Sequence, residues 1–169
     1  MRPVVLLELD GIFVCPTAPE NANCHLLHFS LDIGPTKMCF HLRPNALCLL
    51  RTLVDSAPRQ RFGFWTSATH AYADAVLNTL FIVLKVADWR RRISILYARP
   101  CRRTPIMIKN IFDVHNLLRT SNIVLVDSNL QHVQANPGRA LHVPKWSARG
   151  GAYATRDVFL FNLERWLRC

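Results

Sequence analysis

Short apolar runs separated by polar turn residues set the pattern of this chain. Five of these runs have the length of buried strands: residues 4–7, 61–65, 93–97, 122–126 and 140–143. Apolar residues at helical spacing predict helices over 44–56, 68–80 and 113–119, and a last helix capped by Thr155. In that last helix Phe159, Leu163 and Trp166 are expected to face inward. Alternating strands and helices predict an α/β domain with a parallel sheet flanked by helices.

An insertion separates the first strand from the first helix. Residues 15–23 are rich in Pro, Asn and Ala and predict a loop. Residues 25–31 and 37–42 then form two strand-like runs around Asp-Ile-Gly-Pro, a sequence typical of a hairpin turn. With 169 residues, half of them apolar, we expect one domain over 1–169 with a small β-hairpin insertion at about 15–42.

Acidic residues follow two of the predicted strands directly. Glu8 and Asp10 come after the first strand, and strand alternation would point both to the same side. Asp127 and Ser128 end the strand at 122–126. Ligands of open α/β sheets bind at the carboxyl ends of the strands, and acids there favour a divalent cation or phosphate chemistry. Acids at a strand end also commonly begin a solvated turn, so the position alone leaves both interpretations open.

Two further positions have chemical potential but also ordinary explanations. Thr66 and Ser67 precede a predicted helix, where a hydroxyl either caps the helix or binds a phosphate together with the helix N-terminus. Lys109 follows an apolar run, and a single lysine is normally a surface residue.

The chain is strongly basic, with a formal net charge of +10 and a pI near 10.0. Eight of the basic residues lie between Lys85 and Lys109, against the single acid Asp88. This charge favours phosphorylated or polyanionic partners. Nucleic acid is among the possible partners, but no aromatic platform or nucleic-acid motif accompanies the basic cluster.

The remaining sequence features argue against several classes of protein. The N-terminal apolar run is interrupted by Glu8 and Asp10, and no run of about 18 apolar residues predicts a membrane span. We therefore expect an intracellular protein, nuclear or cytoplasmic. The six cysteines are far apart without a C-x-x-C pair, which favours reduced thiols. Cys24, His25, His28, Cys39 and His41 lack the tight ligand spacing of known zinc modules.

Motifs over nearly the whole chain resemble the haloacid-dehalogenase-like (HAD) phosphatases. The resemblance rests on the acids after the first strand, on Thr66-Ser67, on Lys109 and on Asp127. Within that superfamily, the chain is most similar to the RNA polymerase II C-terminal-domain phosphatases and the NLI-interacting-factor-like enzymes. The most specific stretch is F-W-T-S-A-T-H-A-Y-A-D-A-V at 64–76, and M-I-K-N-I at 107–111 and V-L-V-D-S-N at 124–129 add to it.

The resemblance implies a Rossmann-like HAD fold and Mg²⁺-dependent removal of phosphate from phosphoserine or phosphothreonine in proteins. By position, Glu8 matches the nucleophile and Asp10 the general acid and base. Thr66 and Ser67 match phosphate-binding hydroxyls, and Lys109 matches the lysine that neutralises charge. Glu8, Asp10, Asp127 and Ser128 match the residues around Mg²⁺.

Two positions depart from the family pattern. Ser128 stands where the family has Asp or Asn, which implies a weaker or water-mediated metal contact. Glu8 stands where the family has its nucleophilic aspartate, and the extra methylene displaces the carboxylate by about 1 Å, which can cost ~10²-fold in rate. Two hypotheses follow: a weak or altered protein phosphatase, or a pseudophosphatase that binds phosphopeptides or proteins without turnover.

Overall fold

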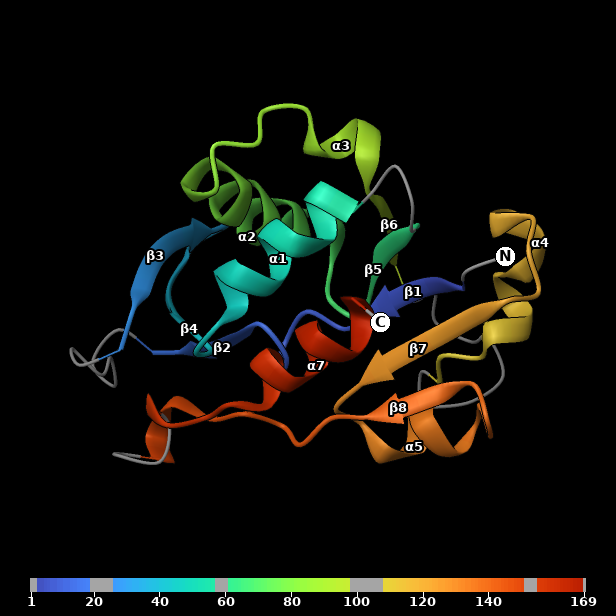
Figure 1. The fold of residues 1–169 in the computed structure, drawn as a ribbon. Helices are drawn as coiled ribbons and strands as arrows, with labels where there is room; N and C mark the ends of the chain where they lie inside the picture. Colours follow the sequence, from blue (N-terminus) through green and yellow to red (C-terminus); the bar gives the residue numbers. More distant parts are fainter. Residues whose placement is uncertain (1–2, 19–25, 57–60, 98–107, 151–154, 169) are drawn as a thin grey trace.

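The computed structural model describes residues 3–18, 26–56, 61–97, 108–150 and 155–168. Its main element is a five-stranded parallel sheet with strand order β6-β5-β1-β7-β8 (Figure 1). The strands are β1 (Val4–Leu7), β5 (Phe62–Thr66), β6 (Ser94–Tyr97), β7 (Ile123–Asp127) and β8 (Ala140–His142). All five predicted strands therefore form, within a residue or two of the expected bounds, and the α/β prediction is confirmed.

A second, antiparallel sheet forms the insertion, with strand order β2-β4-β3. It consists of β2 (Val14–Thr17), β3 (His28–Ile33) and β4 (Thr36–Leu42). The predicted hairpin is confirmed: Ile33 pairs with Thr36, and Gly34 makes the turn with a φ of 60°. The predicted loop over 15–23 is wrong for its first part, because Val14–Thr17 pairs with β4, and residues 19–23 lie outside the described residues.

Helices cover both faces of the parallel sheet. In Figure 1, α1 (Ala46–Ser56), α2 (His70–Val83) and α7 (Phe159–Arg168) lie together, and α4 (His115–Leu118) lies at the opposite side of β1. The shorter elements are α3 (Trp89–Arg92), the 3₁₀ turns η2 (Ile111–Asp113) and η3 (Ala148–Gly150), and α5 (Leu130–Gln134).

The central strand β1 is buried on both faces, as its uninterrupted apolar sequence predicts. Val5 and Leu7 belong to the larger core, which holds buried side chains of α1, α2 and α7. Val4 and Leu6 point the other way and pack with Ile111 and other residues of a smaller core. This double burial fixes β1 in the middle of the sheet, so its carboxyl end is held rigidly.

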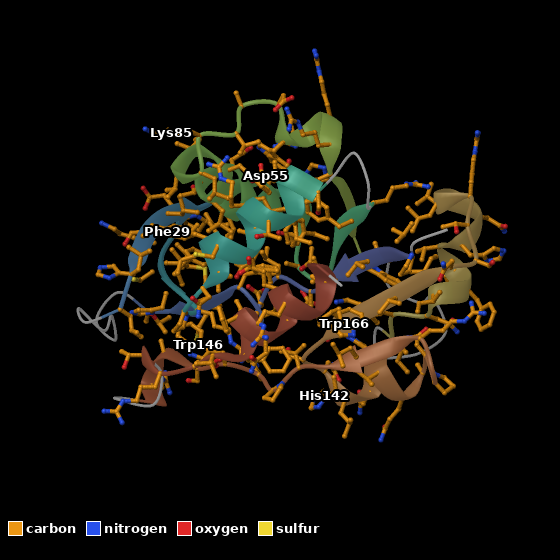
Figure 2. All side chains as sticks on the ribbon, in the orientation of Figure 1. Phe29, Asp55, Lys85, His142, Trp146 and Trp166 are labelled. Carbon is orange, nitrogen blue, oxygen red and sulfur yellow. The ribbon has the colours of Figure 1, made fainter. Side chains whose placement is uncertain are left out.

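The last helix keeps two of the three inward positions predicted for it. It begins at Phe159, whose N–H donates to the Asp157 carboxylate at 2.8 Å, so Asp157 rather than Thr155 caps it. Leu160, Leu163 and Leu167 are buried, whereas Trp166 is 53% exposed (Figure 2). Phe159 is partly buried and packs against the larger core. The predictions for Phe159 and Leu163 are therefore confirmed and that for Trp166 is wrong, because Leu167 takes the inward position one residue later.

The structure also bears on membrane-spanning helices and on the cysteines. None of the helices in the described residues is long and apolar enough to cross a membrane. Cys15, Cys39 and Cys48 are free thiols, and the other cysteines lie outside the described ranges.

Candidate functional site

The candidate site lies where three neighbouring parallel strands end. Glu8 follows β1, Thr66 is the last residue of β5, and Asp127 is the last residue of β7. Because β1 pairs with β5 on one side and with β7 on the other, these residues meet at one edge of the sheet. This is the edge where open α/β sheets bind their ligands.

Glu8 is a buried carboxylate with partners on both oxygens. Only 5% of the residue is exposed. Its Oε1 accepts a hydrogen bond from the N–H of Leu9 at 2.9 Å, and its Oε2 accepts one from the ammonium of Lys109. The backbone N–H of Glu8 donates to the carbonyl of Val126 at 2.9 Å, which continues the ladder between β1 and β7.

Lys109 is the cation of the site and is almost fully buried, at 1% exposure. Its Nζ donates to Glu8 and to Oδ2 of Asp127, at 2.8 Å from the latter. Burial lowers the pKa of Lys109, and the charge of Asp127 opposes that shift. The interpretation of Lys109 as an ordinary surface lysine is therefore wrong, and two buried carboxylates that would repel each other share one ammonium.

Asp127 accepts four hydrogen bonds. Its Oδ1 accepts from the N–H of Asn129 at 2.7 Å, while Oδ2 accepts from Lys109 and from Nδ1 of His132 at 3.0 Å. The backbone carbonyl of Asp127 accepts from Val143 at 2.9 Å. Burial alone would raise the pKa of Asp127, but the hydrogen bonds from His132 and Lys109 bring it below the ordinary value. Asp127 is therefore ionised and fixed in one orientation.

His132 is a member of the site that the sequence analysis missed. It lies in α5 and is buried, and the Nδ2 of Asn129 lies 3.5 Å from its Nε2. Asn129 caps α5, and its Oδ1 accepts from the N–H of Gln131 at 2.9 Å, so its amide nitrogen faces the imidazole. This arrangement places the imidazole proton on Nδ1, pointing at Asp127. The sequence did contain a signal for His132: it follows the strand-end acid Asp127 by five residues, and the helix-capping Asn129 lies between them.

Asp10 turns toward a different partner from Glu8. The hydroxyl of Tyr72, on α2, donates to Oδ1 of Asp10 at 2.7 Å. Burial raises the pKa of Asp10, whereas the Tyr72 hydrogen bond and the charge of Lys145 lower it by smaller amounts. The pKa of Tyr72 is raised by burial and by the charge of Asp10, so its hydroxyl stays protonated and donates. Asp10 can thus hold a proton at a higher pH than a surface aspartate.

The hydroxyl residues of the prediction occupy different environments. Thr66 is fully buried, and its Oγ1 accepts from the N–H of Ala68 at 3.0 Å. Ser67 is exposed. The interpretation of this pair as the cap of α2 is wrong, because Thr69 caps that helix by accepting from Tyr72. Ser128 is partly buried and lies against Gly11.

The structure therefore brings together Glu8, Lys109 and Asp127 in direct contact, with His132 behind Asp127. Three residues of the site could hold a metal ion together: Glu8, Asp127 and His132 each offer one ligand atom, and these atoms lie within 4.8 Å of one another. Among the described residues, no other group of three His, Cys or acidic side chains lies this close together. Asp10 is outside this group and pairs with Tyr72.

Comparison with known proteins identifies the family. Residues 3–168 match the model of the NLI interacting factor-like phosphatases. The chain belongs to this family. A solved structure of similar fold is a variant of the fission yeast RNA polymerase II CTD phosphatase Fcp1 bound to beryllium fluoride, with a TM-score of 0.57 and 17% sequence identity. That match covers 97% of this chain and 49% of the Fcp1 chain, so the chain spans about half of that structure's length. A search of curated proteins gives no significant match.

The family assignment confirms the resemblance read from the motifs, and the Fcp1 match confirms the HAD-like fold. At 17% identity the Fcp1 match concerns the fold alone. The motifs of an NLI interacting factor-like phosphatase do not say which site residues touch in this chain. The structure does: Lys109 contacts Glu8 and Asp127, and Tyr72 contacts Asp10.

Arg43 supports the loop that carries Asp10 in this family member. Its Nη1 donates to the carbonyl of Gly11 at 3.3 Å and to that of Pro144 at 3.2 Å, and its guanidinium pairs with Asp157. The carbonyl of Gly11 also accepts from the N–H of Trp146 at 2.9 Å. Arg43 thereby joins the loop after β1 to two distant segments.

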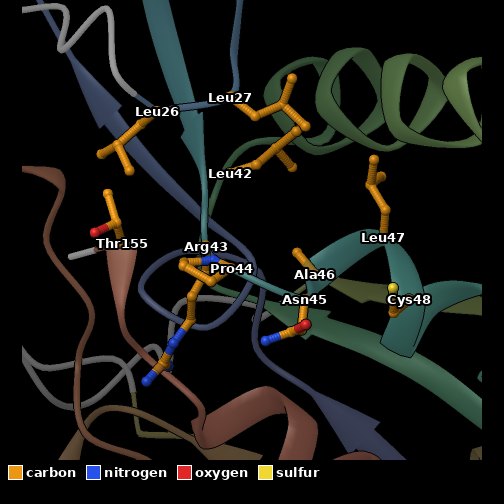
Figure 3. Close-up of a pocket in the computed structure, with 10 residues that line it drawn as sticks. All are labelled: Leu26, Leu27, Leu42, Arg43, Pro44, Asn45, Ala46, Leu47, Cys48 and Thr155. Atoms are coloured by element: carbon orange, nitrogen blue, oxygen red, sulfur yellow. The ribbon is translucent and has the colours of Figure 1, made fainter. Parts of the chain in front are cut away.

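Arg43 also lines a cavity of about 310 Å³ (Figure 3). Four leucines line it, from the insertion and from the start of α1, together with the stretch from Arg43 to Ala46, Cys48 and Thr155. Figure 3 shows the side chain of Arg43 extending away from these leucines. Neither Glu8, Lys109 nor Asp127 lines this cavity, so we place the candidate chemistry at the sheet edge.

Proposed function

We propose that this chain removes phosphate from phosphoserine or phosphothreonine in proteins, using a divalent cation. The observation that carries the proposal is the ammonium of Lys109 held between the buried carboxylates of Glu8 and Asp127 at the carboxyl edge of the sheet. Phosphoryl transfer requires positive charge close to the attacking group, and this arrangement supplies it in a dry environment.

The proposed reaction has two steps. A carboxylate oxygen of Glu8 attacks phosphorus, the bond from phosphorus to the serine or threonine oxygen breaks, and Asp10 transfers its proton to that oxygen. Water then attacks the phosphorus of the acyl phosphate on Glu8 and Asp10 takes a proton from that water. The bond from phosphorus to the Glu8 oxygen breaks, which frees the Glu8 carboxylate and inorganic phosphate. Thr66 and Ser67, at the end of β5, are proposed to contact the phosphoryl oxygens.

The residues at this edge fit a magnesium ion. Glu8 and Asp127 offer carboxylate oxygens within reach of each other, and Mg²⁺ prefers oxygen ligands. His132 has its Nδ1 proton directed at Asp127, so it orients this ligand. Asp10 and Ser128 are proposed to complete the ligand set, Ser128 through water. Bound Mg²⁺ would offset charge on the phosphoryl oxygens.

The proposed partner is a phosphorylated protein segment. The net charge of +10 favours an acidic partner. We propose that the protein acts in the nucleus or the cytoplasm, where such segments are found.

A second function is favoured by one observation. Both oxygens of Glu8 already accept hydrogen bonds, from Leu9 and from Lys109, and the glutamate is one methylene longer than the family's aspartate. A carboxylate held in this way is poorly placed for in-line attack. The alternative is a pseudophosphatase that binds a phosphorylated protein at the same edge without turnover.

Hydrolysis of an aryl phosphate and a phosphoserine peptide, with and without Mg²⁺, separates the two functions. If Glu8 is the nucleophile, the native chain is active, Asp10→Asn abolishes activity, and Glu8→Asp raises turnover by up to ~10²-fold. Folded protein that is silent in both the native form and Glu8→Asp would contradict the phosphatase function. Binding of the phosphoserine peptide by that silent protein would support the pseudophosphatase.

A further inference from the structure

Asn136 is a buried asparagine with all its side-chain groups in use. It is 5% exposed and follows the last turn of α5. Its Nδ2 donates to the carbonyl of Lys109 at 2.6 Å and to the carbonyl of His132 at 2.7 Å. Its Oδ1 accepts from the N–H of Ile111 at 2.7 Å.

These three hydrogen bonds join two segments that are separated in the sequence. Two of them hold the backbone directly after Lys109, because they bind the carbonyl of Lys109 and the N–H of Ile111. The third satisfies the His132 carbonyl in the last turn of α5, where helical carbonyls lack helical partners. One amide therefore fixes the backbone of Lys109 relative to the backbone of His132.

This connection reaches the two side chains that contact Asp127. The Nζ of Lys109 lies 2.8 Å and the Nδ1 of His132 lies 3.0 Å from the same oxygen, Oδ2 of Asp127. A lysine side chain has a long, flexible stem, so its ammonium keeps one position only when its backbone is held. Asn136 provides that restraint through the backbone, because its side chain binds the carbonyls of Lys109 and His132 and the N–H of Ile111.

We propose that Asn136 is a positioning residue that sets the ammonium of Lys109 between Glu8 and Asp127. Its effect on phosphate chemistry rests on the proposed function, whereas its effect on Lys109 does not. Asn110 provides a matched control: it is an asparagine in the same loop, and its Oδ1 accepts from the N–H of Phe112 at 3.0 Å. Asn110→Ala thus removes a local backbone hydrogen bond beside Lys109 but leaves the bonds of Asn136.

The test measures how accessible the amine of Lys109 is in the full chain. The chain has four lysines, of which Lys37, Lys85 and Lys145 are exposed and serve as internal references. Acetic anhydride labels the native protein, and mass spectrometry reads the rate at each lysine. Because each lost hydrogen bond changes a local equilibrium by a few-fold, we expect Asn136→Ala to raise the Lys109 rate about tenfold or more and Asn110→Ala to leave it within about twofold.

A variant destabilised in another part of the protein controls for labelling of Lys109 through global unfolding. Leu53→Ala empties a buried position in α1, in the core on the other face of the sheet from Ile111. It should expose Lys109 only as far as the whole protein unfolds, which urea titration measures. If Asn136→Ala does not fold, Asn136→Gln keeps both polar groups but moves them by one methylene, and we expect the same selective rise at Lys109.

The outcomes separate this proposal from the proposed function. An unchanged Lys109 rate in the folded Asn136 variants, or a rise matched by Leu53→Ala at equal stability, would overturn the positioning role. A selective rise in a protein without phosphatase activity would retain the positioning role and reject the proposed function. If the phosphatase is active, we expect Asn136→Ala to lower kcat about tenfold with a smaller change in KM, and Asn110→Ala to change neither.

Discussion

The buried guanidinium of Arg43 and the partly buried carboxylate of Asp157 form an ion pair across 114 residues of sequence, with 2.8 Å between Nη2 and Oδ2. The Nε of Arg43 donates to the same oxygen at 3.0 Å, and its guanidinium lies 5.1 Å from the ring centroid of Phe159. Since Arg43 also holds the carbonyl of Gly11, this pair connects the start of α7 to the loop that carries Asp10.

Arg43→Met should lower the free energy of unfolding by roughly 3 kcal/mol, because it removes the cationic partner of Asp157 and one donor to each of the carbonyls of Gly11 and Pro144. Urea titration measures the change. Arg92→Met is the matched control, because Arg92 and Asp88 form a pair at the same 2.8 Å but with side chains 45% and 48% exposed. That variant should change stability by less than about 1 kcal/mol. Equal losses in the two variants would contradict the anchoring role of Arg43.

Much of the fold followed from local sequence patterns. The run at 4–7 predicted a central strand because apolar residues on both faces are typical of a buried parallel strand. The error at Trp166 has a simple cause: helical spacing allowed either Trp166 or Leu167 on the inward face, and packing against the sheet decided for Leu167.

The site was harder to predict because its contacts join distant segments. Strand alternation placed Glu8 and Asp10 on one side, but β1 ends at Leu7 and Gly11 has a φ of 77°, so the alternation rule stops applying before Asp10. Glu8 consequently contacts Lys109 while Asp10 contacts Tyr72. The roles of His132, Asn136 and Arg43 depend on partners that only the folded chain brings together.

Gly11→Ala should destabilise the loop between Glu8 and Val14. Gly11 has a positive φ, and an added Cβ would lie 2.9 Å from Cγ of Lys145 and 3.0 Å from Oγ of Ser128. We expect a loss of roughly 1–3 kcal/mol in unfolding free energy, measured by thermal or urea unfolding.

Gly138→Ala separates the two causes of that loss. Gly138 also has a positive φ, 69°, but an added Cβ there would meet nothing within 4 Å. Its alanine variant should lose about 1 kcal/mol, the cost of the backbone conformation alone. Equal losses at the two positions would show that Lys145 and Ser128 move aside without cost.

Tyr72→Phe removes the hydroxyl that donates to Asp10 and keeps the ring, which packs edge-on against Phe40 with 5.6 Å between centroids. We expect stability to fall by about 1 kcal/mol, because the partly buried carboxyl loses a hydrogen bond. If Asp10 is the proton donor, kcat for the aryl phosphate should fall about tenfold through its lost orientation.

Thr69→Ala is the control for Tyr72→Phe. It removes the cap of α2, which is bonded to the N–H of Tyr72, and leaves the Tyr72 hydroxyl on Asp10. A stability loss of about 1 kcal/mol without a change in kcat is expected. The same fall in kcat in both variants would assign the effect of Tyr72→Phe to the position of α2.

Magnesium binding provides a prediction that does not depend on turnover. Because Glu8 and Asp127 are buried and share one ammonium, the described site carries more carboxylate charge than cationic charge. A cation that binds only the folded chain stabilises it, by about 2.7 kcal/mol at a concentration 100 times its Kd. We therefore expect Mg²⁺ to raise the Tm of the native chain relative to Na⁺ at equal ionic strength, and chelation to reverse the rise.

Two variants test where the cation binds. Asp127→Asn should abolish the rise whatever its own Tm. Asp55→Asn changes an exposed residue of α1 (Figure 2) and should retain the rise. A rise of equal size in the Asp127 variant would place the cation elsewhere on the protein, and the absence of a rise in the native chain would contradict a magnesium site at this edge.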